Sequence, residues 1–241
     1  MNPVRTLSTT KAAFFSAYPR PINSVYRRVV EELLVELHLA TVNSAFVYDP
    51  FFALGLVTIY DGLMEAYQPP EQREGIFNAL CKALQLKPEV LRKNARDLLE
   101  LMGGGDPSQR LNLLCLKPEA EDVGGLKGIL ERMAHPPYAY SRVLAVGLYT
   151  AYEEVARTVY TDAEERTRRF LEDVVGKLPF SAERVKKDLE LYRNSLDRMK
   201  QARAVVEEMV KAARRQQERR QSTTTLPETP LADPGEPRKP N

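Results

Sequence analysis

Residues 49–67 read DPFFALGLVTIYDGLMEAY, and this stretch decides the fold. Asp followed by Pro predicts a helix start, because Asp caps a helix N-terminus and Pro at the first helical position loses no hydrogen bond. The residues that follow are apolar nearly all round until Asp61, which is the pattern of a helix buried on most of its faces. We therefore expect this helix to form the centre of a hydrophobic core.

Apolar residues on both sides of this stretch recur at spacings of three and four, which indicates further helices. No run combines period-two alternation with β-branched residues, so strands are not expected. Helix caps are predicted at Ser8, Asn23 and Thr161, the last forming a capping box with Glu164. The predicted fold class is all-α, a compact helical bundle whose main further helices cover the ranges 24–42, 76–84, 88–103, 111–116, 126–133 and 140–160.

The composition is that of an ordinary soluble domain, with 241 residues, 43% hydrophobic side chains and a net charge of +2. These values exclude collagen-like, wholly disordered and disulfide-scaffold proteins, and the charge is too small to argue for nucleic acid. Cys81 and Cys115 lack motif spacing, so we expect buried free thiols and no disulfide. The N-terminus lacks a secretory signal, and the longest uncharged apolar stretch, 50–60, falls short of the about 20 residues that a membrane span needs.

The last helix carries a heptad pattern, in which apolar positions alternate by four and three over 185–213 and Arg203 interrupts them. This is the seam of a coiled coil. At about 1.5 Å per residue, a helix over 182–220 is about 60 Å long, so we expect part of it to project from the bundle. Either its first half packs on the body and the rest is solvated, or it pairs with a partner helix. The Arg in the seam argues against a tight homodimer and favours a monomer.

Three parts are expected along the chain: an all-helical core domain over 1–180, a long basic helix over 181–221 and a disordered tail over 222–241. The helix has 12 basic and 7 acidic residues. The tail has five Pro and few large apolar groups, so burial cannot offset its ordering entropy. The basic excess complements the helix dipole or meets an anionic surface, and its residues are Lys211, Arg214, Arg215, Arg219 and Arg220.

Signatures of catalysis and cofactor binding are absent from the sequence. His38 and His135 have no second ligand at metal spacing, and neither follows a Glu by three residues, as a carboxylate-bridged metal site in a helix bundle requires. There is no phosphate-binding loop and no Ser nucleophile elbow. The basic helix has Tyr192 alone as an aromatic, unlike a single-strand nucleic-acid binder. We predict no enzymatic activity, no cofactor, no metal and no nucleic-acid partner.

Three long stretches carry a resemblance to a known family. They are VRTLSTTKAAFFSAYPRPINSVYRRVVEELLVELHL at 4–39, FVYDPFFALGLVTIYDGLMEAYQPPEQREGIFNALCKAL at 46–84 and YSRVLAVGLYTAYEEV at 140–155. They closely resemble the thylakoid formation family, the photosystem II biogenesis and repair proteins of cyanobacteria and chloroplasts. Because no transit peptide precedes them, we expect a cyanobacterial member.

The resemblance implies a non-catalytic, all-helical protein without cofactor residues. It implies a location in the cyanobacterial cytoplasm and at the cytoplasmic face of the thylakoid membrane. It also implies a role in photosystem II assembly and repair, and a link to the membrane-bound FtsH protease. Our hypothesis is that the protein binds and stabilises FtsH assemblies, with photosystem II subunits as further candidate partners.

Two surfaces are candidate partner contacts. One is the basic end of the terminal helix; the other is the PRPINSVYRR turn, where Arg20, Arg27 and Arg28 cluster. Three guanidiniums at a fixed turn can pair with acidic groups of a partner. The alternative is intramolecular pairing of these arginines with Glu31, Glu32 or Asp49.

A function of a different class also fits the sequence. A peripheral protein could organise thylakoid membranes by binding anionic lipid directly through the basic residues of 211–220, because each basic residue near such a surface contributes about 1 kcal/mol. Salt-sensitive binding to anionic vesicles without a protein partner distinguishes this alternative from protease binding.

Overall fold

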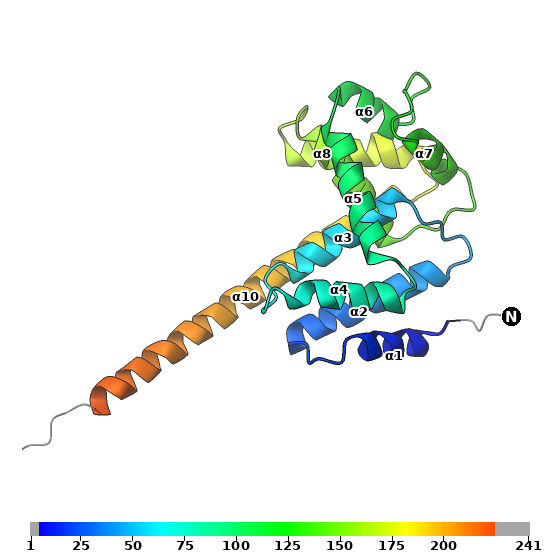
Figure 1. Cartoon of the computed structure of the whole chain (residues 1–241). Helices are drawn as coiled ribbons and strands as arrows, with labels where there is room; N and C mark the ends of the chain where they lie inside the picture. Colours follow the sequence, from blue (N-terminus) through cyan, green and yellow to red (C-terminus); the bar gives the residue numbers. More distant parts are fainter. Residues whose placement is uncertain (1–4, 225–241) are drawn as a thin grey trace, which may run out of the picture. The chain divides into compact units, whose positions relative to one another are not determined.

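The computed structural model describes the backbone of residues 5–224, and the side chains of residues 5–202, 204 and 208. Within residues 5–224 the structure contains helices and no strands, so the predicted all-α fold class is confirmed (Figure 1). The α-helices are α1 Leu7–Ala17, α2 Ser24–Val42, α3 Pro50–Met64, α4 Gln72–Ala83, α5 Pro88–Gly103, α6 Pro107–Leu114, α7 Leu126–Ala134, α8 Arg142–Ala156, α9 Ala163–Arg169 and α10 Ala182–Thr224.

The helix predicted from residues 49–67 is the centre of the core. Asp49 caps α3 as expected, since its carboxylate accepts a hydrogen bond from the Phe52 N–H at 2.9 Å. α3 packs against both α8 and α5, and α1 packs against α4 and α2. The buried residues of α3 are Phe51, Phe52, Ala53, Leu54, Gly55, Leu56, Ile59, Tyr60 and Met64.

Two glycines set the closest approach between α3 and α8. A Cβ added to Gly55 would lie 1.8 Å from the carbonyl oxygen of Val143, and one added to Gly147 would lie 1.8 Å from that of Phe51. Real Cβ atoms essentially never come closer than 3.0 Å to another heavy atom. The two backbones are therefore in direct contact, and any side chain at either position would push the helices apart.

Some predicted helix ends are wrong by a few residues, because a neighbouring polar side chain forms the cap. Thr6, not Ser8, caps α1 and forms a capping box with Thr9. Asp162, not Thr161, caps α9 by accepting from the Glu165 N–H. Two further corrections concern α6 and α8. α6 begins at 107, earlier than the predicted 111, because Asp106 caps it and Pro107 follows. α8 covers 142–156, shorter than the predicted 140–160.

Between α9 and α10 the chain forms a π-helical turn, Phe170–Val174, and a 3₁₀ turn, Val175–Lys177. The chain divides into two compact units, Met1–Met199 and Lys200–Asn241, and α10 runs through both. Its first turns belong to the first unit, where Val185 and Leu189 are buried. The Tyr192 hydroxyl donates a hydrogen bond to the Thr58 carbonyl of α3 at 3.2 Å. The first half of the predicted seam thus packs on the body.

In the second unit, α10 continues to Thr224, three residues past the predicted helix end. The side chains of all four seam positions beyond Met199, including Arg203, lie outside the described part. Pairing through a coiled coil therefore stays a prediction. The predicted disordered tail covers 222–241; its first three residues are helical within α10, which corrects that boundary, and 225–241 lie outside the described residues.

Candidate interaction groove along α2

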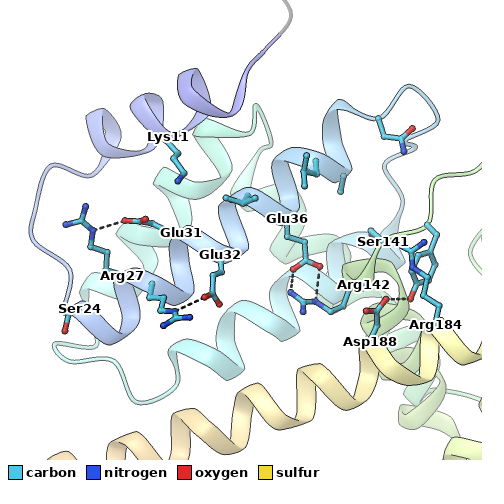
Figure 2. A pocket seen from close by; sticks show the side chains of 16 residues that line it. Lys11, Ser24, Arg27, Glu31, Glu32, Glu36, Ser141, Arg142, Arg184 and Asp188 are labelled. Atoms are coloured by element: carbon cyan, nitrogen blue, oxygen red, sulfur yellow. Dashed lines mark hydrogen bonds and ion pairs between the residues drawn. The ribbon is translucent and has the colours of Figure 1, made fainter.

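An open groove with a volume of about 970 Å³ runs along the outer face of α2, within the first compact unit (Figure 2). α2 is amphipathic: Val30, Leu33, Leu34, Leu37 and His38 are buried against the body, so its other face remains available. α1 contributes Lys11 to the groove, the N-terminal end of α8 contributes Ser141 and Arg142, and α10 contributes Arg184 and Asp188. We call this hollow the α2 groove.

The α2 side of the groove carries two local ion pairs. Arg27 Nε lies 2.8 Å from Glu31 Oε1, and Arg28 Nε lies 2.9 Å from Glu32 Oε1. Both are i,i+4 pairs on an exposed helix face, where solvent screening leaves such a pair with little effect on stability. These contacts hold the four side chains along the groove wall while leaving them in solvent.

The opposite wall is held by long-range polar contacts. The guanidinium of Arg142 pairs with the Glu36 carboxylate through two hydrogen bonds, one of them from Nε to Oε1 at 3.0 Å. The Tyr140 hydroxyl donates to Asp188 Oδ2 at 2.6 Å. Burial, followed by this bond to a carboxylate, raises the pKa of Tyr140. The first contact ties α2 to α8, and the second ties the segment before α8 to α10.

Two cations of the groove have no ion-pair partner among the described residues: Lys11 and Arg184. The Arg184 guanidinium lies 4.7 Å from the centre of the Tyr140 ring, a cation–π contact that leaves its N–H groups available. Beside these charges the groove is apolar, because Val35 and Leu39 line it and Leu39 is 62% exposed. The groove thus offers an apolar strip whose lining carries a net charge of +1, from five basic and four acidic residues.

Of the residues predicted to contact a partner, Arg27 and Arg28 line the groove, where they pair with Glu31 and Glu32 as the intramolecular alternative stated. Asp49 is not their partner, since it is buried and accepts a hydrogen bond from Tyr138. Arg20 is exposed in the α1–α2 connection, outside the groove lining, and forms no ion pair with any described residue. The basic residues Lys211, Arg214, Arg215, Arg219 and Arg220 lie in α10, but their side chains are outside the described part.

Sequence reasoning missed the other half of this groove. Glu36 and Arg142 are 106 residues apart, and Tyr140 and Asp188 are 48 apart, so no local spacing connects them. The i,i+4 spacing of Arg27 with Glu31 was the available signal, and it marks a helix face without showing what lies opposite.

Each of the two histidines has a hydrogen-bond partner within the chain. His38 Nδ1 lies 2.9 Å from the Thr10 hydroxyl, and His135 Nδ1 lies 2.7 Å from the Glu131 carbonyl oxygen. Cys81 and Cys115 are both free thiols; Cys81 is buried as predicted, whereas Cys115 is only partly buried. Within the described residues, no group of three or more His, Cys, Asp or Glu side chains is placed to hold a metal ion. No described helix has the length and apolar character that crossing a membrane requires.

Comparison with known proteins identifies close relatives. Residues 6–221 match the profile of a family described as thylakoid formation protein. The chain is 86% identical to Protein Thf1 of a Synechococcus strain over 237 residues, which is 98% of this chain and 99% of that protein. It is 41% identical to Protein Thf1 of Acaryochloris marina over 215 residues, 88% of this chain and 85% of that protein. A solved structure, "Structure of Psb29 at 1.55A", matches with a TM-score of 0.74 and 39% identity, covering 89% of this chain and 99% of the other.

Proposed function

Since this chain belongs to the thylakoid formation protein family, we propose that it is a non-catalytic accessory factor in thylakoid formation and in photosystem II biogenesis and repair. It works at the cytoplasmic face of the cyanobacterial thylakoid membrane, where it binds and stabilises the FtsH protease complex. The observation that carries this proposal is the match over nearly the full length of both chains to Protein Thf1 of Synechococcus. The role assigned to FtsH comes from the resemblance in the sequence.

Two surfaces are offered for the protease. The α2 groove is open to solvent, and its walls are held in place by the Arg142–Glu36 pair. The second surface is the basic part of α10, where 12 basic and 7 acidic residues lie within 181–221. Either surface suits a partner with exposed carboxylates, because charge complementarity raises the association rate and orients the encounter.

Affinity isolation of the tagged full-length protein from thylakoids after strong light tests this function. We expect FtsH subunits to co-purify and to survive a high-salt wash. Truncation after Met199 tests the terminal helix, and the double substitution Arg27→Ala/Arg28→Ala tests the groove wall. Arg157→Ala/Arg168→Ala is the matched control, because both arginines form local ion pairs elsewhere on the surface. Recovery of no more FtsH than from an untagged strain contradicts the proposal.

The charge excess of residues 181–221 favours a second candidate function, direct binding of anionic lipid by the terminal helix. Flotation with vesicles of phosphatidylglycerol tests it. Binding that is lost in high salt and on truncation after Met199, without any protein partner, supports the lipid function. Flotation that is equal for the full-length and truncated proteins contradicts it.

A further inference from the structure

We infer that the α2 groove docks an acidic amphipathic helix of a partner protein, with the apolar face of that helix on Val35 and Leu39 and its carboxylates at Lys11 and Arg184. The inference rests on the proposed function, because it takes the protein to be a factor that binds another protein. It goes further by stating which part of the chain binds and the chemistry of the segment that it accepts.

The apolar part of the argument concerns one row of side chains on α2. Val35, Leu39 and Val42 follow each other at spacings of four and three, so they lie on one helix face. Leu39 is 62% exposed and Val42 is 42% exposed. A contiguous apolar strip with a polar rim marks an interaction site more often than isolated exposed residues do. Because the strip follows the axis of α2, it fits a second helix whose apolar residues recur at the same spacing.

The charges decide which helix fits. Three of the four carboxylates that line the groove form ion pairs, and they are Glu31 with Arg27, Glu32 with Arg28 and Glu36 with Arg142. The fourth, Asp188, accepts a hydrogen bond from the neutral Tyr140 hydroxyl, so the lining keeps a net charge of +1 from five basic and four acidic residues. The cations Lys11 and Arg184 have no ion pair among the described residues. A docked helix with Glu or Asp beside its apolar face completes the pairing, whereas one with Lys or Arg there meets like charge.

The same charge argument disfavours the terminal helix of a second copy as the occupant. Residues 200–221 hold 7 basic and 3 acidic side chains, so this segment would bring more positive charge to Lys11 and Arg184. The net positive charge of the groove lining instead favours an acidic helix from a different protein as the occupant.

Two helical peptides of about 18 residues, the length that spans α2 at about 1.5 Å per residue, test this inference on the full-length protein. Both peptides carry the same apolar row; one has Glu beside the row and the other has Lys. We expect fluorescence anisotropy to show binding of the Glu peptide at least about tenfold tighter than that of the Lys peptide. We expect Leu39→Asp and Lys11→Glu each to lower the affinity for the Glu peptide by about tenfold or more.

Matched controls separate the groove from general charge and surface effects. Val90→Asp, like Leu39→Asp, replaces an exposed apolar side chain by a carboxylate; Val90 lies on α5 and is 42% exposed. Lys82→Glu, on α4, makes the same charge change as Lys11→Glu. We expect both controls to bind the Glu peptide like the wild type. Urea unfolding of all four variants is measured as well, and a wild-type midpoint shows that a loss of peptide binding does not come from unfolding.

Equal affinity for the two peptides, or Glu-peptide binding that survives both groove substitutions, overturns the inference. A dimer in sedimentation that Leu39→Asp abolishes assigns the groove to a second copy and overturns it too. Its failure differs from failure of the proposed function: FtsH recovery without a preference for the Glu peptide refutes the acidic helix alone. A preference for the Glu peptide without FtsH recovery refutes the protease as the partner.

Discussion

Replacing Gly147 by Ala tests how the body of this protein is assembled. The new Cβ would lie 1.8 Å from the Phe51 carbonyl oxygen, about 1.6 Å short of the 3.4 Å at which ordinary contact begins. The obstructing atom belongs to the backbone of α3, so no side-chain rotation relieves the clash. We therefore expect α3 and α8 to move apart along much of their contact.

The size of the effect follows from that displacement. A gap of 0.5–1 Å already forfeits about a quarter to a half of the dispersion attraction between the atoms that it separates. Overpacking of a core costs about 1–3 kcal/mol and sometimes more, whereas Ala in place of Gly in a helix returns about 1 kcal/mol. Because the clash is with backbone at the centre of the core, we expect Gly147→Ala to lower the free energy of unfolding by about 3 kcal/mol.

Urea unfolding followed by circular dichroism measures this change, and thermal unfolding should show a loss of about 6–12 °C. Gly128→Ala is the matched control, because Gly128 is exposed within α7 and a Cβ there meets nothing within 4 Å. We expect the control to stabilise the protein by about 0.5–1 kcal/mol. A Gly147→Ala protein with the wild-type midpoint would refute the contact between the two backbones.

Three further predictions concern buried polar groups. Burial raises the pKa of Asp49, and the hydrogen bond from Tyr138 opposes that shift. We expect Tyr138→Phe to lower the free energy of unfolding by about 1–3 kcal/mol at neutral pH, and by less as acid protonates the carboxyl of the folded protein. Urea midpoints measured across pH check this. Burial, followed by the charge of Arg5, lowers the pKa of His38 below 6.5. The stability that neutral His38 contributes is therefore complete above pH 6.5 and is lost as the pH falls from 6.5 to the pKa in the folded protein. We expect His38→Gln to flatten the pH dependence of the free energy of unfolding over that range. Burial raises the pKa of Cys81 to about 12 and that of Cys115 to about 11, so a thiol reagent at neutral pH should label both slowly in the native protein and rapidly in urea; rapid native labelling would contradict the burial.

Local sequence was sufficient for the helices themselves. Asp49 with Pro50 predicts the start of α3, and Asn23 predicts that of α2, because a cap acts on N–H groups two or three residues away. Where these predictions missed, as at Ser8 and Thr161, a second capping residue lay one or two positions earlier or later. The all-α class likewise follows from apolar residues that recur at helical spacing. The central place of α3 follows from its nearly continuous apolar residues, which the structure buries.

Local sequence did not predict the contacts that join the helices. Nothing near Gly55 or Gly147 in the sequence shows that the two meet, and each alone reads as a weak point in a helix. The same holds for Glu36 and Arg142, which form a wall of the α2 groove from positions 106 residues apart. The sequence by itself determined which segments are helical, because caps and periodicity act within a few residues. The tertiary structure alone decided which faces touch and which stay open, because that choice depends on how all the helices fill one core together.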